Sequence, residues 1–181
     1  MATVDVLVAG YARSDGVGST VSLVRSGDLV AVVDPGMVAD RRLILDPLEA
    51  LGVDPDAVTD VVLSHHHPDH TINVALFPQA RVHDHWAIYH RDQWTDRPAE
   101  GFALADDVVL WETPGHTLQD ITTLVTTDAG VVALTHLWWF EGKDDDPRAT
   151  HLDLLERHRA RVREVAQRIV PGHGPAFDLA R

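Results

Sequence analysis

The sequence contains no cysteine, and this absence excludes whole classes of site. Without thiols the chain forms no disulfide, no zinc ribbon and no thiol-based catalytic centre. A site for a transition metal would therefore be built from histidine and carboxylate side chains. The 12 histidines among 181 residues are a high number for a chain of this length, so the side chains for such a site are present.

Positive charge is also scarce. The chain has 28 acidic and 15 basic residues, Lys143 is its only lysine, and the formal net charge is −13. Such a charge repels a polyanion unless basic residues cluster locally. Five arginines do cluster near the C-terminus, with glutamates among them, and a solvated helix face is the preferred interpretation for Arg157, Arg159, Arg161, Arg163 and Arg168. We therefore expect a small-molecule substrate rather than a nucleic acid, and a homodimer stays open.

Long apolar runs are absent as well. No stretch approaches the roughly 18–20 apolar residues that a membrane span requires. The first residues, from Met1 to Val6, lack the basic region and the apolar segment of a secretion signal. These absences predict no membrane partner and a cytoplasmic location. The length predicts one compact domain over residues 1–181.

Strand and helix patterns alternate along the chain. Apolar or alternating runs predict strands over residues 4–9, 21–25, 29–34, 61–63, 80–82, 108–111, 121–126, 131–134 and 169–170. Helical patterns cover residues 40–51, 71–76, 86–93 and 150–168. Strands interleaved with helices in both halves indicate a layered α/β arrangement.

One segment, Ser64-His65-His66-His67-Pro68-Asp69-His70, follows a short apolar strand and matches the pattern H-x-H-x-D-H. Alternate residues of an extended loop point the same way, so His65 and His67 are expected to bind one metal together. Asp69 and His70 then leave this line and can face a second metal. Imidazole and carboxylate ligands suit zinc, iron or manganese. A surface histidine run is the alternative, and the placement of Asp69 and His70 disfavours it.

This segment resembles the second sequence motif of the metallo-β-lactamase superfamily, and further segments agree with that family in order along nearly the whole chain. Asp34-Pro35-Gly36 resembles the first motif, in which the aspartate braces the metal-binding loop. The segment around His116 resembles the third motif, and Pro171-Gly172-His173-Gly174 resembles the last. The hairpin near Val21 and the C-terminal segment resemble a subgroup of the family, metallo-β-lactamase domain-containing protein 1 and its bacterial relatives.

The resemblance implies both a fold and a ligand set. The fold is of the α/β class, a four-layer αββα sandwich of two mixed sheets flanked by helices. His116 would complete a first metal site with His65 and His67, and His173 would join Asp69 and His70 on a second metal. Asp69 would also orient the attacking nucleophile. The cofactor implied is zinc, as two ions, with iron or manganese as alternatives.

The chain departs from the family at one position. The family places an aspartate that bridges the two metals after the strand that follows the third motif, and His136 stands there in this chain. A carboxylate has two oxygens and a charge, whereas a neutral imidazole offers one lone pair to one metal. Three outcomes stay open: a two-metal site with His136 as a terminal ligand, a one-metal site, or weak catalysis. A replacement anion could come from Glu141, Asp144, Asp145 or Asp146, although a solvated loop is the preferred interpretation of this run.

The resemblance implies a metal-dependent hydrolase that uses a metal-bound hydroxide on an ester, thioester, lactone or phosphodiester. A mononuclear iron oxygenase and a metal-binding protein with little activity are the alternatives. Two local questions also stay open. Asp120 either holds His116 in the correct tautomer or makes an ordinary loop hydrogen bond. Trp138 and Trp139 belong either to the core or to an apolar wall over the metals.

Overall fold

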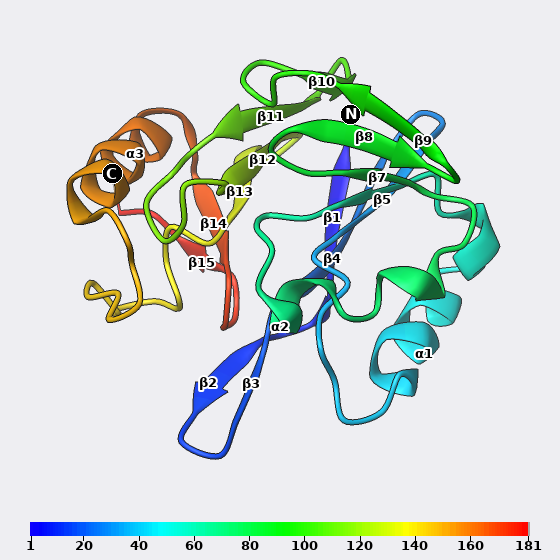
Figure 1. Ribbon diagram of the computed structural model, residues 1–181, viewed down its shortest axis with the longest axis horizontal. Coiled ribbons are helices and arrows are strands. Elements are labelled where there is room, and N and C mark those ends of the chain that lie inside the picture. Colours follow the sequence, from blue (N-terminus) through cyan, green and yellow to red (C-terminus); the bar gives the residue numbers. More distant parts are fainter. Residues whose placement is uncertain (181) are drawn as a thin grey trace.

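Two large β-sheets face each other in the computed structural model, which describes residues 1–180 (Figure 1). The first sheet has seven strands in the order β1-β4-β5-β6-β7-β8-β9. Their bounds are β1 Thr3–Val8, β4 Val21–Ser26, β5 Leu29–Val33, β6 Asp60–Val62, β7 Arg81–His83, β8 Ala87–His90 and β9 Gln93–Asp96. The pairs β5–β6 and β6–β7 are parallel and the other pairs are antiparallel, so this sheet is mixed.

The second sheet has six strands in chain order, from β10 to β15. They are β10 Ala103–Ala105, β11 Val108–Glu112, β12 Ile121–Thr127, β13 Gly130–Thr135, β14 Arg168–Pro171 and β15 Phe177–Asp178. Only β13 and β14 pair in parallel. A separate hairpin of β2 (Tyr11–Arg13) and β3 (Gly16–Gly18) projects from the body of the protein (Figure 1).

Helices cover the outer face of each sheet. Figure 1 shows α1 (Arg42–Ala50) and α3 (Leu152–Val165) on opposite sides of the molecule. The helix α1 packs through Ile44 and Leu48 on the first sheet, and α3 packs through Leu155 and Val162 on the second. The remaining helices are short: α2 Pro68–Thr71 and the 3₁₀ turns η1 Pro55–Ala57 and η2 Val74–Leu76.

The alternation of side chains along each strand separates the core into layers. In β4, Leu23 packs under α1, whereas its neighbour Val24 lies in the apolar layer between the two sheets. In β13, Ala133 likewise packs under α3, and Leu134 enters the layer between the sheets. Successive residues of a strand point to opposite faces, which produces this division. The predicted four-layer αββα sandwich is confirmed.

Four strands end where residues expected to bind a metal or to brace the metal-binding loop begin. Asp34 follows β5, the segment Ser64 to His70 follows β6, His136 follows β13 and His173 follows β14 soon after its end. The parallel pairs β5–β6 and β13–β14 bring the carboxyl ends of their strands to one edge of each sheet. Loops at such strand ends commonly carry functional residues on a rigid scaffold.

The helix predicted over residues 86–93 is wrong, because β8 and β9 form an antiparallel hairpin there. Arg91 takes a left-handed φ of 58° in the turn. The rings of Tyr89 and Trp94 meet across the two strands at 4.7 Å, edge to face. Such cross-strand aromatic pairs stabilise a hairpin. A short run with mixed polar and apolar residues does not by itself separate helix from strand.

The prediction of a solvated arginine face on α3 is wrong for Arg159, whose side chain is only 2% exposed. Its guanidinium donates to the carbonyl oxygens of Leu137 and Asp144, both at 2.7 Å, and pairs with Glu156. Arg159 therefore ties α3 to the segment after β13, which begins with His136. No helix within residues 1–180 has the length and apolar character to cross a membrane. The domain predicted over 1–181 also includes Arg181, which lies outside the described residues.

Candidate metal centre

The three side chains expected at the first metal site converge. The Nδ1 atom of His67 lies 2.9 Å from Nε2 of His65 and 3.0 Å from Nε2 of His116. His65 and His116 are buried, whereas His67 is exposed and lies at the opening of the site. The segment after β6 and the segment between β11 and β12 thus meet, although 49 positions separate His67 from His116.

The three side chains expected at the second site converge beside them. The Oδ2 atom of Asp69 lies 3.6 Å from Nε2 of His70 and 3.7 Å from Nε2 of His173. His70 is fully buried, and its Nε2 has no hydrogen-bond partner within the described residues. A buried polar atom without a partner is costly, and a bound cation would remove that cost.

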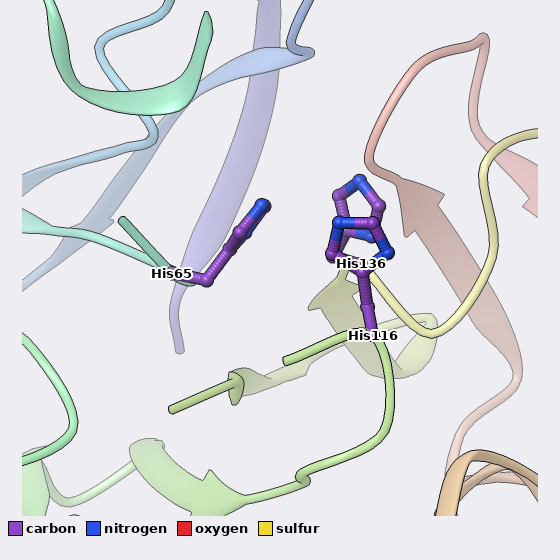
Figure 2. Close-up of side chains that lie close together, drawn as sticks. All are labelled: His65, His116 and His136. Atoms are coloured by element: carbon purple, nitrogen blue, oxygen red, sulfur yellow. The ribbon is translucent and has the colours of Figure 1, made fainter. Parts of the chain in front are cut away.

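His136 lies between the residues of the first expected site and those of the second. It can share a metal with His65 and His116, and equally with His70 and His173. Figure 2 shows the ring of His65 directed toward the facing pair His116 and His136. The Nε2 atom of His136 lies 3.0 Å from Nε2 of His173, while its buried Nδ1 has no hydrogen-bond partner in residues 1–180. His136 therefore lies between the two groups, where the resemblance stated above implies a bridging aspartate.

The backbone of Gly172 passes close to His136. A Cβ atom at position 172 would lie 2.5 Å from Cδ2 of His136, closer than real carbon contacts allow. The glycine of the Pro-Gly-His segment is thus required by the size of the histidine that faces it.

The outer nitrogens of the histidines are held by acceptors. Asp34, with a left-handed φ of 52°, binds His70 Nδ1 through Oδ2 at 2.7 Å. The same carboxylate accepts hydrogen bonds from the backbone N–H and the hydroxyl of Ser64, each at 2.7 Å. His173 donates from Nδ1 to the carbonyl of Gly18 at 3.1 Å. These contacts leave the Nε2 atoms of His70 and His173 facing the site, the arrangement typical of metal-binding histidines.

His116 is held by a residue that the sequence did not single out for this role. Its Nδ1 lies 2.8 Å from Oδ2 of Asp146, whose side chain is fully buried. The prediction of a solvated acidic run is therefore wrong for Asp146, although Glu141, Asp144 and Asp145 are exposed. Asp120 instead accepts from the backbone and the hydroxyl of Thr117, at 2.8 and 2.6 Å, so the loop hydrogen bond was the correct alternative.

The surroundings of four histidines in the cluster favour their neutral form, and these are His65, His67, His136 and His173. Burial, followed by the charges of the neighbouring imidazoles, lowers the pKa of His65 and His136 well below its usual value. Burial also lowers the pKa of His67, and it lowers the pKa of His173 to about 4. Near neutral pH these rings therefore carry free lone pairs, the form that binds metal.

The donor set fits zinc or a similar transition metal. Two nitrogens bound to one zinc at about 2.0–2.1 Å in a tetrahedral site lie roughly 3.3 Å apart. The separations of 2.9 and 3.0 Å among His65, His67 and His116 are within a few tenths of an ångström of that value. Imidazole with a single carboxylate is also the ligand chemistry that zinc, iron and manganese accept. Whether each of these residues binds a metal stays a prediction.

The cluster lies at a cavity of about 220 Å³. Trp139 lines it, together with Val17 from the β2–β3 hairpin. Trp138, in contrast, is 3% exposed and packs under α3. Of the two adjacent tryptophans, one thus belongs to the core and the other to the wall of the cavity. His66 lies outside the cluster, where its ring stacks on Trp86.

Comparison with known proteins decides the family. The Metallo-beta-lactamase superfamily model matches residues 14–176. The chain belongs to this superfamily. It is 33% identical to metallo-beta-lactamase domain-containing protein 1 of Xenopus laevis, over 99% of this chain and 82% of that protein. The expected family and subgroup are confirmed.

Solved structures of the superfamily share the fold. A Thermotoga maritima crystal structure superposes with a TM-score of 0.80 at 20% identity, covering 98% of this chain and 99% of the other. An N-acyl homoserine lactone hydrolase, solved with its product at the catalytic metal centre, gives a TM-score of 0.66 at 19% identity. The overlap covers 85% of this chain and 80% of the lactone hydrolase.

Proposed function

We propose that this protein is a metal-dependent hydrolase that binds two zinc ions and cleaves an ester, thioester or lactone bond in a small molecule. The observation that carries the proposal is the convergence of seven histidine and aspartate side chains at one cavity. Six of them are buried or half-buried: His65, Asp69, His70, His116, His136 and His173. The seventh, His67, is exposed. A structural relative is a lactone hydrolase with a catalytic metal centre, which supports this reaction class.

The metals would supply water of lowered pKa and a positive charge that polarises the substrate carbonyl. His65, His67 and His116 would hold one ion, and Asp69, His70 and His173 the other, with His136 between them. Asp69 lines the cavity, so its carboxylate can accept a hydrogen bond from the attacking water and orient it. Trp139 and Val17 contribute apolar side chains to the lining of the cavity.

The cavity favours a small substrate over a nucleic acid. Its volume of about 220 Å³ lies below the roughly 300–1,000 Å³ of sites for drug-sized ligands. The net charge of −13 also opposes a polyanion. A phosphodiester of a polymer is thus the less favoured substrate, and a cytoplasmic location stays a prediction.

A metal-binding protein with little activity is the second candidate, and His136 is the observation that favours it. The ring has no negative charge to offset two divalent cations, so the second ion would bind less tightly than with an aspartate. The iron oxygenase alternative stays a prediction, and metal identity decides it.

Two measurements test the proposal. Elemental analysis of the protein as purified is expected to give about two zinc atoms per chain. The Asp69→Asn variant is expected to lower kcat for esters, thioesters or lactones by about 10²–10⁴-fold, the range for loss of a group that positions a proton. His151→Gln, an exposed histidine at the start of α3, is the matched control and should keep both metal and activity. Zinc without any turnover would favour the second candidate, and one iron atom would favour the oxygenase.

A further inference from the structure

The cavity has an unexpected charge at its opening. Besides the metal-centre residues and Trp139, it is lined by two arginines, Arg13 from the β2–β3 hairpin and Arg148 from the loop before α3. Both side chains are exposed. Neither forms an ion pair with any carboxylate in residues 1–180, although the chain has 28 acidic residues. Two unpaired guanidiniums beside one small cavity are notable in a chain with a net charge of −13.

The backbone of Arg148 is held close to the metal centre. Its backbone N–H donates to Oδ1 of Asp146 at 2.9 Å, and Oδ2 of the same carboxylate holds His116. A single buried side chain thus positions one histidine of the cluster and the arginine loop together. The guanidinium of Arg148 itself makes no hydrogen bond within the described residues and remains available to a ligand.

For Arg13, in contrast, the side chain itself is restrained. Its guanidinium stacks on the ring of Tyr11 at 4.5 Å, which restricts the side chain. Just after the hairpin, the backbone N–H of Ser19 donates to the carbonyl oxygen of Asp69 at 3.3 Å, and that of Thr20 donates to the carbonyl oxygen of Gly172 at 2.7 Å. The hairpin is therefore tied to two of the loops that carry metal-centre residues, and Figure 1 shows it projecting from that side of the body.

We infer that the substrate carries an anionic group, a carboxylate or a phosphate, away from the bond that is cleaved, and that Arg13 and Arg148 bind this group. The inference rests on the proposed function, because the histidine cluster fixes where the cleaved bond lies. Guanidinium groups recognise carboxylate and phosphate through paired N–H donors. They also offset locally the negative field that would repel such a substrate. The cavity is too small for a polymer to be enclosed, so the substrate is a small organic anion.

Three esters test the inference: monophenyl adipate, phenyl hexanoate and phenyl 5-phosphonopentanoate. They present a similar acyl chain that ends in a carboxylate, a methyl group or a phosphonate. The zinc-loaded protein is expected to cleave one or both anionic esters with a higher kcat/KM than the neutral ester, and the larger preference identifies the group. Exposed ion pairs contribute modestly, so Arg13→Gln and Arg148→Gln should each lower kcat/KM about twofold to fivefold for the anionic esters only.

Arg42→Gln is the matched control, because Arg42 is an exposed arginine on α1 away from the cavity and the change in charge is the same. Equal rates on the neutral and both anionic esters would overturn the inference while leaving the hydrolase intact. If Arg42→Gln lowered kcat/KM for the anionic esters as much as the cavity variants do, the inference would also be overturned.

A binding measurement separates this inference from the proposed function. Calorimetric titration of the zinc-loaded protein with adipate and with hexanoate needs no turnover. Both acids present one carboxylate to the metals, and only adipate has a second. Tighter binding of adipate, lost in the double variant of Arg13 and Arg148, would support the inference even if no ester were cleaved. Equal binding of the two acids would refute it.

Discussion

Asp146 offers the sharpest test of how the candidate metal centre is built. Its carboxylate is fully buried and lies 2.8 Å from Nδ1 of His116. Burial would raise the pKa of Asp146, but the hydrogen bond and the charge of His116 outweigh it and lower the pKa. The carboxylate is therefore ionised at neutral pH. It orients the imidazole of His116 and makes the other ring nitrogen a stronger ligand for a metal. The variant Asp146→Asn keeps the shape of the side chain and removes this charge.

The size of the effect follows from the contact. Loss of an outer partner of a metal-binding histidine typically costs 10–100-fold in metal affinity or activity. Asn still offers one carbonyl oxygen, so we expect about a tenfold loss of zinc affinity in Asp146→Asn. Asp146→Ala also removes the acceptor of the Arg148 N–H, and we expect a loss nearer 100-fold there.

Competition between the protein and a chromophoric zinc chelator measures these affinities directly. The control is Asp145→Asn, one residue away, where the carboxylate is 75% exposed and, within residues 1–180, pairs only with Lys143. Unchanged zinc affinity in Asp146→Asn would refute the argument that Asp146 tunes His116. An equal loss in Asp145→Asn would show that net charge, rather than the hydrogen bond, is responsible.

Three further perturbations are expected to give measurable results. His136→Asp should raise the affinity for a second zinc ion at least about tenfold in a stepwise titration, since about 1.4 kcal/mol of added attraction gives that factor. Unchanged stoichiometry and affinity would contradict this. Arg159→Met leaves two backbone carbonyls without their donor, so urea denaturation should show that the free energy of unfolding falls by about 2–4 kcal/mol. The control Arg157→Met, at an exposed position, should leave it nearly unchanged. Asp60 is fully buried, and although burial raises its pKa, hydrogen bonds led by that of His83 lower it to about 2 from 3.8. Because the folded pKa is lowered, Asp60 contributes about 2 kcal/mol above pH 3.8, which is lost as the pH falls through about 2. Urea unfolding of wild type and Asp60→Asn should therefore differ at pH 7 and converge at low pH, and a constant difference would disprove this.

The metal-centre motifs were predictable because they are local. Each lies directly after a strand that an apolar run marks, so the residues at its end follow from the sequence. The order of the motifs matched a known family, and His136 stood out as the one departure. The layered fold followed from the same alternation of strands and helices.

Other features depended on contacts across the fold. The contact between Asp146 and His116 joins positions 30 residues apart, and an acidic run in sequence resembles any solvated loop. Arg159 looked like one arginine among several on a polar helix, and only the packing of α3 shows that it is buried. The two arginines of the cavity were not distinguishable either, because nothing local relates Arg13 to Arg148.

The close approach of Gly172 to His136 has a consequence for sequence evolution. Any side chain at position 172 would collide with the imidazole, so the two positions cannot change independently. A lineage that replaced His136 with the shorter aspartate would relax the constraint on Gly172, whereas a lineage that keeps the histidine must keep the glycine. Among relatives of this chain, a larger residue at the equivalent of position 172 should therefore occur only where the partner position holds a smaller side chain than histidine.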